Sequence, residues 1–520
     1  MHSILMVAAE NGTFPGGKVG GIGDVIRDAS PALAKAGCLV QVVTPSFADV
    51  VGRARGASQF EVSVPFRAGL ERLLLVDISA DRNPEGVRHW VLDHPLFTAT
   101  GGIYNDDPTG TPFATDASKF ALFCAGVGAA ILNGRFGPLD VLHLHDWHAA
   151  WLLVLRRFAP QFQSLQSLRT VYTIHNLALQ GVRPFAGHWS SLDAWFPDLK
   201  VDRSILQDTR WPDCVNPTAT AIRLADAVHT VSPTYAQEIL HPSAIEERGY
   251  YGGEGLEADL RNAADQGRLH GILNGCEYPA AAETTGRRTL LAMADAELLV
   301  WVAGRATVAS THLVAQKRLG EWSTRSEPEV LITSVSRITG QKVGLLQQTL
   351  EDGTTTLEAL LQSLGDRGLY VFLGTGAPEL ESFLTKTSAL HSNFLFLNGY
   401  SERLANAMYA AGDLFLMSSS FEPCGISQML AMRSGQPCLV HGVGGLRDTV
   451  SDEVNGFVFG GENPQEQADN LLAKFDRAMS THRHEPEFWQ RLSRAAKAAR
   501  FRWEESVAQY CSQLYSPTPE

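Results

Sequence analysis

Two cations lie close together in the loop SRITGQK (336–342), directly after an apolar run. Arg337 and Lys342 could clamp a diphosphate without a metal ion, because charge-assisted contacts stabilise negative charge that develops on a leaving group. A solvated loop face is an equally open interpretation of these two residues. The pair is nevertheless the best candidate in the chain for binding an anionic ligand.

Three further loops each lie between an apolar run and a helix-like segment. KVGGIGD (18–24) and GVGGLRDT (442–449) carry glycines that let backbone N–H groups approach a phosphate at a helix start. FEPCGIS (421–427) places Glu422 at such a start, where an acid could also simply cap the helix. The first loop lacks the G-x-G-x-x-G spacing of dinucleotide-binding proteins, so a structural turn and a ligand loop both remain open.

Two polar clusters follow other apolar runs. In HLHDWH (143–148), His143 and His145 would share one face of a strand, which is compatible with a metal site. No second ligand pair accompanies them, so histidines satisfied by hydrogen bonds are the stronger interpretation. HNLALQG (175–181) offers amide and imidazole groups that can bind hydroxyl groups.

The chain contains two series of apolar runs that alternate with helix-like segments, as in parallel sheets covered on both faces. The first series comprises 3–9, 39–44, 141–145, 170–174, 227–231 and 269–273. The second comprises 331–335, 369–373, 394–397, 414–417 and 437–440. We therefore predict an α/β fold with two doubly wound, Rossmann-like parallel-sheet domains, whose ligands bind beyond the carboxyl ends of the strands.

These series divide the chain into four parts. We expect an N-terminal Rossmann-like domain over 1–275 and a C-terminal one over 330–486. Residues 276–329 are less regular and are interpreted as a linker and irregular segment. Residues 487–520 are predicted to form a C-terminal helix, because their apolar residues recur every three or four positions. We also expect this helix to cross back to the N-terminal domain.

Composition excludes several classes of protein. The 520 residues carry 43 basic and 56 acidic side chains, a net charge of −13, which disfavours binding to nucleic acid or to anionic membranes. The 7 cysteines are odd in number and scattered, so they predict neither a disulfide framework nor a zinc cage. No signal-like start and no membrane-length apolar run is present, which predicts a cytoplasmic protein.

Ten segments occur in the order seen in bacterial glycogen synthases and plant starch synthases, and the chain resembles this family from residue 4 to about residue 475. The segments are KVGGIGDV, HLHDWHAA, TIHNLALQG, TVSPTYAQEI, GILNG, SRITGQK, GTGAPELE, GYSERLA, FEPCGISQMLAMRSGQP and GGLRDTV. The resemblance implies a GT-B architecture, with two domains facing across a cleft, the N-terminal one on the acceptor side and the C-terminal one on the nucleotide-sugar side. It also implies a retaining hexosyltransferase that moves glucose from ADP-glucose to the non-reducing end of an α-1,4-glucan.

The resemblance also implies roles for single residues. The residues implied to make catalytic contacts are Glu422, His145, Lys342 and Arg337. Donor binding falls to Lys18, Gly20, Gly21, Asn274, Tyr400, Cys424, Gly425, Gly444, Gly445 and Thr449, and acceptor binding to Asp116 and Asp24. No metal or other cofactor is implied, because ADP-glucose is a substrate. The expected partners are ADP-glucose and glycogen, without nucleic acid or membrane, and the oligomeric state is left open.

The chain departs from the family pattern in three places. The segment ENGTFPGGKVGG (10–21) is longer than usual, and the stretch after GILNG, up to about Gly320, matches poorly. Leu430 occupies a position where related enzymes carry a glutamate for the ribose, although glycogen synthases commonly lack it too. Alternatives are therefore a transferase that uses UDP-glucose or a smaller acceptor, and a catalytically silent glucan-binding protein of the same fold.

Overall fold

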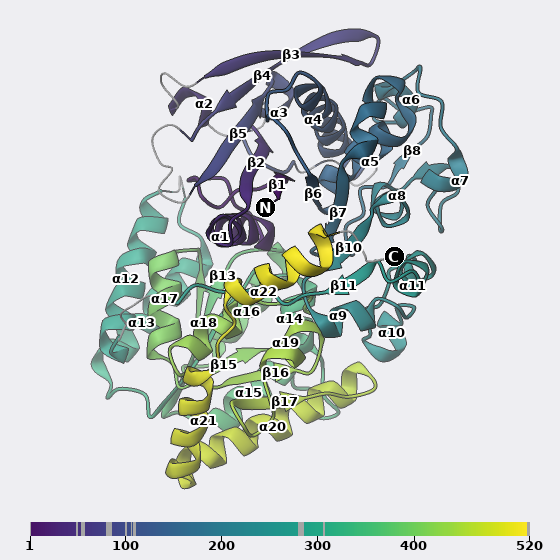
Figure 1. The fold of residues 1–520 in the computed structure, drawn as a ribbon. Helices are drawn as coiled ribbons and strands as arrows, with labels where there is room; N and C mark the ends of the chain where they lie inside the picture. The colour runs from purple at the N-terminus through teal and green to yellow at the C-terminus, as the bar shows by residue number, and fades with distance from the viewer. Residues whose placement is uncertain are drawn as a thin grey trace. The chain divides into compact units, whose positions relative to one another are not determined.

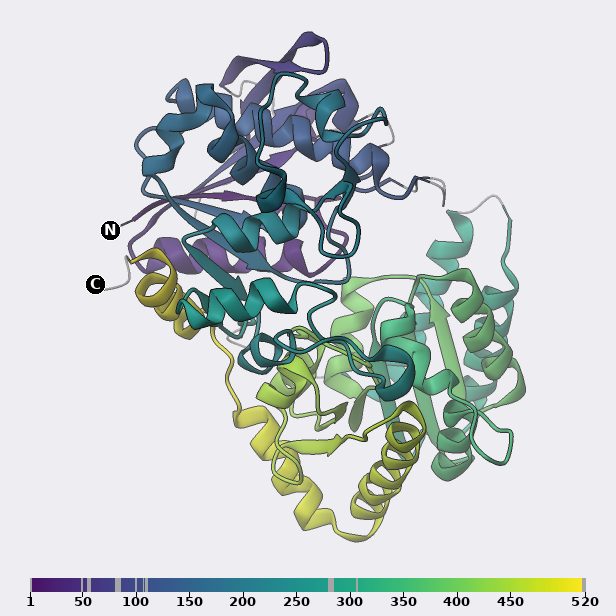
Figure 2. The ribbon, with the colours of Figure 1, turned by 90° about the vertical axis from the view of Figure 1, so that its right-hand side faces the viewer.

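A computed structural model describes residues 2–47, 50–53, 58–79, 86–98, 101–105, 107, 111–278, 285–304 and 307–516. The chain forms two compact units. The first comprises Met1–Pro242, Gly252–Glu277 and Arg502–Glu520, and the second comprises Ser243–Tyr251 and Tyr278–Phe501. Each unit has helices on both faces of a largely parallel sheet, as Figures 1 and 2 show, so the predicted α/β class is confirmed.

The first unit has a nine-stranded sheet in the order β11-β10-β7-β6-β1-β2-β5-β4-β3. Its strands are β1 (Ser3–Val7), β2 (Leu39–Pro45), β3 (Gln59–Phe66), β4 (Gly69–Asp77), β5 (Val87–Asp93), β6 (Val141–His145), β7 (Arg169–Ile174), β10 (Ala227–Thr230) and β11 (Leu269–Gly271). All pairings are parallel except β3 with β4 and β4 with β5. The sequence analysis missed these two hairpins, because it searched for the continuous apolar runs of parallel strands.

The helices of the first unit include five of functional interest here: α1 (Gly21–Lys35), α4 (Ala114–Leu132), α5 (Asp146–Phe158), α22 (Trp503–Gln509) and the π-helical turn η2 (Tyr510–Tyr515). The others are α2 (Val50–Arg53), α3 (Pro95–Thr98), η1 (Pro160–Ser167), α6 (Leu192–Trp195), α7 (Arg203–Leu206), α8 (Pro217–Leu224), α9 (Pro233–Glu238) and α11 (Glu257–Asp265). A small ladder joins β8 (Arg183–Pro184) to β9 (Cys214–Val215).

Alternate side chains of β1 point into two different cores, which explains its continuous apolar sequence. Leu5 and Val7 pack with residues of α4 and α5, whereas Ile4 and Met6 pack with residues of α1 and α22. Helix α4 is long and apolar enough to cross a membrane by composition, but most of it is buried. It packs against α5 and β3, so its composition is that of a core helix.

The second unit has a six-stranded sheet in the order β14-β13-β12-β15-β16-β17, with every pairing parallel. Its strands are β12 (Val330–Val335), β13 (Gly368–Gly374), β14 (Phe394–Asn398), β15 (Leu414–Met417), β16 (Cys438–His441) and β17 (Gly456–Phe459). Its helices are α10 (Ile245–Arg248), α12 (Arg287–Ala303), α13 (Ser310–Thr324), α14 (Gly340–Gln347), α15 (Thr356–Leu364), α16 (Pro378–Leu390), α17 (Glu402–Ala411), α18 (Ser427–Arg433), α19 (Gly444–Thr449), α20 (Pro464–His484) and α21 (Pro486–Ala498).

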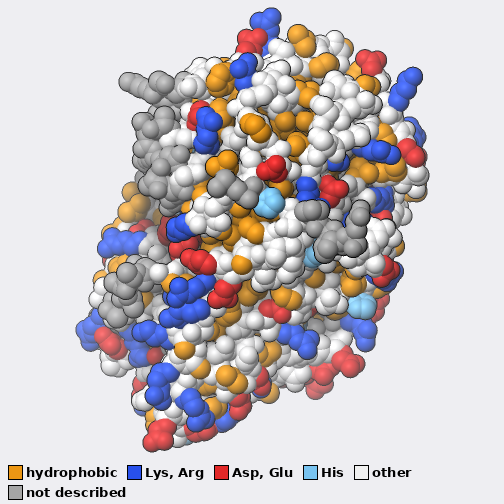
Figure 3. Space-filling model, viewed as in Figure 1, with side chains coloured by type: hydrophobic (Ala, Val, Ile, Leu, Met, Phe, Trp, Pro, Cys, Tyr) orange, Lys and Arg blue, Asp and Glu red, His pale blue; other side chains and the backbone are white. Residues whose placement is uncertain are grey.

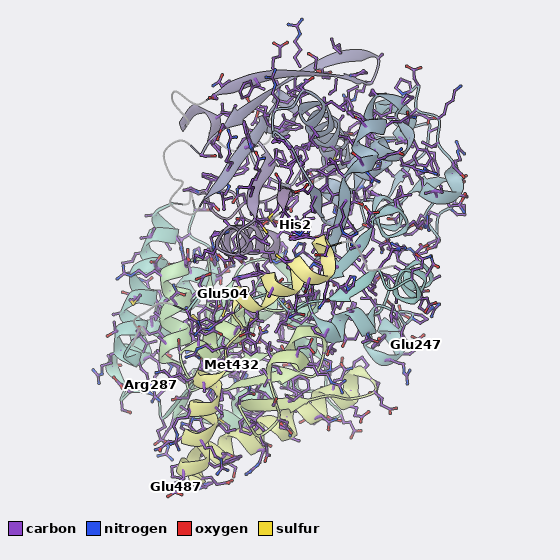
Figure 4. All side chains as sticks on the ribbon, in the orientation of Figure 1. His2, Glu247, Arg287, Met432, Glu487 and Glu504 are labelled. Atoms are coloured by element: carbon purple, nitrogen blue, oxygen red, sulfur yellow. The ribbon has the colours of Figure 1, made fainter. Side chains whose placement is uncertain are left out.

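The interpretation of 276–329 as an irregular linker is wrong for most of its length, because α12 and α13 lie within it. Leu290, Ala294 and Leu298 recur every four residues and are buried on one face of the second unit's sheet. Arg287, labelled in Figure 4, forms an ion pair with Asp413 at 2.7 Å and joins the start of α12 to the start of β15. The helical spacing was present in the sequence, but Leu299 and Val300 are also exposed and obscure it.

The C-terminal segment also differs from the expected single helix. Helix α21 ends at Ala498 in the second unit, and α22 begins at Trp503 in the first. No proline or glycine stands between them. The break arises because Leu492 belongs to a core of the second unit and Trp503 to a core of the first, so the chain extends between them.

Charged side chains on the face shown in Figure 3 are mixed in sign, with lysines and arginines beside aspartates and glutamates. This face therefore carries no broad region of a single charge. A polyanion such as nucleic acid is attracted to a broad basic surface. The charges that matter for a small anionic ligand lie in loops at the ends of strands.

Candidate active site

In the second unit, the predicted loops follow three neighbouring strands. SRITGQK follows β12, the loop bearing Glu422 follows β15, and Gly444 begins α19 after β16. Because β12, β15 and β16 are adjacent and parallel, these loops emerge at the same edge of the sheet. The direction of strand order reverses at β12, which is where open α/β sheets bind their ligands.

Lys342 and Glu422 form an ion pair between Nζ and Oε2. Glu422 is 6% exposed, and its Oε2 also accepts a hydrogen bond from Ser419 Oγ at 3.1 Å. Gln341 Nε2 donates to the carbonyl oxygen of Phe421 at 2.7 Å and holds the two loops together. A lysine and a hydroxyl group therefore compensate this nearly buried carboxyl group for its lost hydration.

Arg337 differs from Lys342, because its side chain is exposed. It makes no ion pair or side-chain hydrogen bond with any residue that the structure describes. The backbone of its loop is fixed, since Ile338 N donates to Thr375 O at 2.8 Å. The loop thus offers one cation that is not engaged within the described chain beside another that is paired with a carboxylate.

Two glycines let the loops after β15 and β16 touch at the backbone. Gly444 has φ of 43°, and a side chain there would overlap the carbonyl oxygen of Glu422. A side chain at Gly445 would overlap the backbone of Cys424, and Gly445 N donates to Glu422 O at 3.1 Å. These glycines therefore serve close packing around Glu422, a role the sequence analysis had not assigned to them.

Gln428 is a site residue that the sequence analysis missed. Its Nε2 lies within hydrogen-bond distance of Cys424 O, Gly425 O and Thr449 Oγ1, at 3.2, 3.0 and 3.2 Å. Gly425 has φ of 75°, which favours glycine, and a side chain there would crowd the Gln428 amide. Gln428 thus fixes the loop that carries Glu422, and its place in a family motif is its one signal in the sequence.

Tyr400 lies apart from the other candidates of the second unit. It follows β14, which is separated from β12 by β13 at one edge of the sheet. Its side chain is 60% exposed. Trp301 of α12 packs against Gly399, where any side chain would overlap the indole ring. The structure thus brings an aromatic pair to this edge, with Tyr400 available at the surface.

In the first unit, the loop after β1 is organised by a residue that the sequence analysis overlooked. Glu10 is 2% exposed, and its Oε2 accepts hydrogen bonds from the backbone N–H groups of Val19 and Gly20, both at 2.8 Å. Tyr104 donates its hydroxyl group to Oε1 at 2.7 Å. The Gly20 amide is therefore bonded within the protein, and Glu10 sets the path of the loop.

The lengthened segment before this loop forms a closed turn. Asn11 N donates to Gly17 O at 2.7 Å and Gly17 N donates to Phe14 O at 3.0 Å. Beyond the turn, Lys18 Nζ lies 2.6 Å from Asp24 Oδ1, and Arg27 also contacts that carboxylate at 3.0 Å. Lys18 of the loop and Arg27 of α1 thus both contact the carboxylate of Asp24.

His145 ends β6, the neighbour of β1, and is 1% exposed. Its Nδ1 lies 3.0 Å from His175 Nε2, while its own Nε2 is buried without a hydrogen-bond partner among the described residues. Burial lowers the pKa of His145 well below its usual value, with a further contribution from nearby histidines, so the ring is neutral. An unpaired buried nitrogen is costly, which marks it as a position for a ligand.

A second layer of groups supports His145. The ring of His143 stacks on it at 4.3 Å, and His143 bonds Tyr515 Oη at 2.9 Å and Thr173 Oγ1 at 2.7 Å. Asp146 accepts a hydrogen bond from His175 N at 2.7 Å. The interpretation of hydrogen-bonded histidines is confirmed for His143. No group of three or more His, Cys, Asp or Glu residues in the described ranges is arranged to hold a metal ion.

The remaining candidates of the first unit lie in different surroundings. Asp116 is 2% exposed and is engaged by Asn105 Nδ2 at 2.6 Å and Lys119 Nζ at 3.3 Å. Burial raises its pKa. Asn274 follows the edge strand β11, away from β1, and its Oδ1 is buried without a partner in the described chain. Asp116 thus fixes a loop, whereas Asn274 retains an unused acceptor.

The comparisons with known proteins cover the whole chain. A family model described as the starch synthase catalytic domain matches residues 3–262, and a model of group 1 glycosyl transferases matches 343–476. A glycogen synthase from Streptococcus equi subsp. equi is 33% identical over 521 residues, 98% of each chain. One from Streptococcus pneumoniae is 31% identical over 529 residues, 99% of each chain.

The chain belongs to the glycogen and starch synthase family. It is a retaining glucosyltransferase of GT-B architecture, as the resemblance predicted. Among solved structures, the catalytic domain of starch synthase IV from Arabidopsis thaliana, bound to ADP and acarbose, matches with a TM-score of 0.74 and 27% identity over 99% of this chain and 98% of that one. Sucrose-phosphate synthase from Thermosynechococcus elongatus shares the fold, with a TM-score of 0.55 and 17% identity.

Proposed function

We propose that this synthase transfers glucose from ADP-glucose to the non-reducing end of an α-1,4-glucan such as glycogen. The observation that carries the proposal is the combination of Arg337, Lys342 and Glu422 at the ends of the adjacent strands β12 and β15. Two cations beside one carboxylate suit a donor that has a diphosphate and a glucosyl group. The Arabidopsis relative that binds ADP supports an adenine nucleotide.

In the proposed reaction, cleavage of the anomeric C–O bond leaves negative charge on the diphosphate. Arg337 and Lys342 stabilise this charge as it develops. The glucosyl group gains positive character, which Glu422 favours. Lys342 is paired with Glu422 in the structure, so each charge keeps the other in place until the donor binds.

Retention follows if the acceptor hydroxyl group attacks from the side of the departing diphosphate. A phosphate oxygen then accepts the acceptor's proton, and no protein base is needed. His145 Nε2 and Asn274 Oδ1, both buried and unpaired in the described chain, are assigned to hydroxyl groups of the transferred glucose. A neutral ring suits this role, since it can donate or accept a hydrogen bond without adding charge.

The other assignments complete the proposal. Lys18, Gly20 and Gly21 contact the donor, Tyr400 packs on the nucleobase, and Asp24 and Asp116 orient the acceptor. Cys424, Gly425, Gly444, Gly445 and Thr449 shape the donor site of the second unit. The reaction requires no metal or other cofactor in this proposal. None of the seven cysteines, all within the described residues, forms a disulfide bond, which is compatible with the proposed cytoplasmic location.

A transfer assay tests the proposal. The enzyme is given a glycogen primer with ADP-glucose or with UDP-glucose, and glucan elongation and nucleotide release are measured together. We expect elongation with ADP-glucose. Elongation with UDP-glucose alone would overturn the donor assignment, nucleotide release without elongation would indicate another acceptor, and inactivity with both would favour a binding protein.

A further inference from the structure

Two cysteines that are far apart in the sequence lie in contact within the first unit. Cys38 lies between α1 and β2, and Cys511 lies in η2 of the C-terminal segment. Their Sγ atoms are 3.9 Å apart, and both are free thiols. A disulfide bond has an S–S length of about 2.05 Å, so the two sulfur atoms need to approach by only about 2 Å.

The elements that carry these cysteines are packed together. Helices α1 and α22 are in contact, and they lie side by side in Figure 1. Trp503, Val507 and Tyr510 belong to the same core as Ile26 and Leu33 of α1. The backbone segments that flank the two cysteines are therefore held together by a shared core.

The two thiols also differ in reactivity. Hydrogen bonds from Cys511 and from the backbone of His2 lower the pKa of Cys38 to about 6, whereas the same contact and burial raise the pKa of Cys511. The contact therefore favours the thiolate form of Cys38, which is the nucleophilic form. Cys38 is 7% exposed, so a small oxidant reaches it more readily than a bulky one.

We propose that Cys38 and Cys511 are a site of reversible oxidation by hydrogen peroxide, and that their disulfide fixes the C-terminal segment to the first unit. The Cys38 thiolate attacks one peroxide oxygen, the O–O bond breaks, and the released hydroxide takes a proton to become water. Cys511 then attacks the Cys38 sulfenic acid, the S–O bond breaks, and the departing hydroxide takes the Cys511 proton. In sum, two thiols and one peroxide give one disulfide and two waters.

The segment held by this disulfide supports His145. Tyr515 lies four residues after Cys511 and hydrogen-bonds to His143, whose ring stacks on that of His145. Fixing the segment therefore restrains the layer behind a residue assigned to the sugar. This consequence depends on the proposed function, whereas formation of the disulfide does not.

Peptide mapping tests the site on the full-length enzyme. The protein is treated with hydrogen peroxide at pH 7, free thiols are blocked with iodoacetamide, and tryptic peptides are analysed by mass spectrometry before and after reduction with dithiothreitol. We expect a reducible Cys38–Cys511 link in the wild-type enzyme and in Cys214→Ser, a control that removes another partly exposed thiol, but not in Cys38→Ser or Cys511→Ser. Absence of the link in the wild-type enzyme, or equal yields of links among other cysteines, would overturn the proposal.

Hydrogen exchange tests the effect on the C-terminal segment. Backbone amides of 503–515 should exchange at least about tenfold more slowly in the oxidised enzyme than in the reduced one. The exchange rates of amides in α20 of the second unit should stay unchanged. Equal exchange in both forms would show that the disulfide does not fix the segment. Because neither experiment uses glucose transfer, failure of the proposed function would appear separately, in the transfer assay.

Discussion

The two units present different chemistry at the carboxyl ends of their sheets. The second unit offers charged groups, with Arg337 exposed and Lys342 paired with Glu422. The first unit also carries charges, with Lys18 beside Asp24, but around β6 and β7 it offers neutral rings, because burial lowers the pKa of both His143 and His175 to about 3. Side chains keep their charge where a partner or solvent compensates it and lose it where burial is complete. A diphosphate requires the former kind of group, and sugar hydroxyl groups are served by the latter.

Removing the carboxylate of the second unit should have the largest effect. Glu422→Ala should lower kcat by about 10²–10³-fold, which corresponds to about 3–4 kcal/mol of lost transition-state stabilisation. Glu422→Gln keeps the side-chain volume and a hydrogen-bond acceptor for Ser419, and it isolates the contribution of charge. Steady-state kinetics with ADP-glucose and glycogen measure both variants, and a near-normal kcat for Glu422→Ala would contradict the assigned role.

Disrupting the backbone contact between Gly444 and Glu422 should have nearly as large an effect. Gly444→Ala forces a side chain onto the carbonyl oxygen of Glu422 at a residue with φ of 43°, so we expect a loss of about 3 kcal/mol in stability and a fall in activity. Gly460→Ala is the matched control in the same unit, because nothing lies within 4 Å of its added methyl group. Thermal unfolding compares them, and equal Tm values would show that the close packing is unimportant.

Acid should destabilise the first unit through its histidines. The unfolded chain binds a proton at His143 and His175 near pH 6.5, but the folded chain does so only near pH 3. The contribution of each histidine to the free energy of unfolding is therefore fully present above about pH 6.5. Below that pH it falls by about 1.4 kcal/mol for each unit by which the pH is lowered. Burial raises the pKa of Asp146 to about 7, so protonation of this carboxyl group stabilises the folded chain as the pH falls below 7. This gain in stability offsets the loss from about one histidine.

A series of Tm measurements between pH 7 and pH 5 checks this expectation, with kcat/KM measured alongside. The midpoint should fall on acidification before activity shows any titration of a histidine, because the buried rings stay neutral while the protein remains folded. A constant Tm over this range would contradict the burial of neutral histidines. It would also remove the chemical contrast between the two units.

Removing the exposed cation Arg337 should lower kcat/KM by a smaller factor. Arg337→Ala should lower kcat/KM roughly 30-fold, because one charge-assisted contact to the donor is lost. This change corresponds to a loss of about 2 kcal/mol in transition-state stabilisation. Arg367→Ala is the control, since Arg367 is a surface arginine of the same unit that pairs with Glu329. Lys342→Ala is harder to interpret, because it leaves Glu422 unpaired. Unchanged kinetics for Arg337→Ala would place the diphosphate elsewhere.

The smallest effect should come from the layer behind His145. Tyr515→Phe removes the hydroxyl group that bonds His143 and leaves a buried ring nitrogen without this partner, at a cost of about 1 kcal/mol in stability. We expect a Tm lower by a few degrees and a change in kcat of less than about 10-fold. A variant with unchanged Tm would show that the hydrogen bond makes no net contribution to stability.

The sequence predicted the parts of the molecule that depend on local pattern. Continuous apolar runs located most of the parallel strands to within a few residues, because both faces of each strand are buried, but they did not predict β5 or β17. Arg337, Lys342 and Glu422 were found because loops at strand ends carry chemistry whose residue types are recognisable. The family resemblance supplied their roles, since spacing alone left a solvated loop and a helix cap open.

Only the tertiary structure decided which atoms remain available. Glu10 and Gln428 have no distinctive local signal, because their role depends on backbone groups of loops that are remote or buried. The contact of Cys38 with Cys511 joins the two ends of the chain, and no sequence spacing reveals it. The break between α21 and α22 likewise follows from two separate cores. Long-range packing determines these features, and a pattern read along the chain carries local information alone.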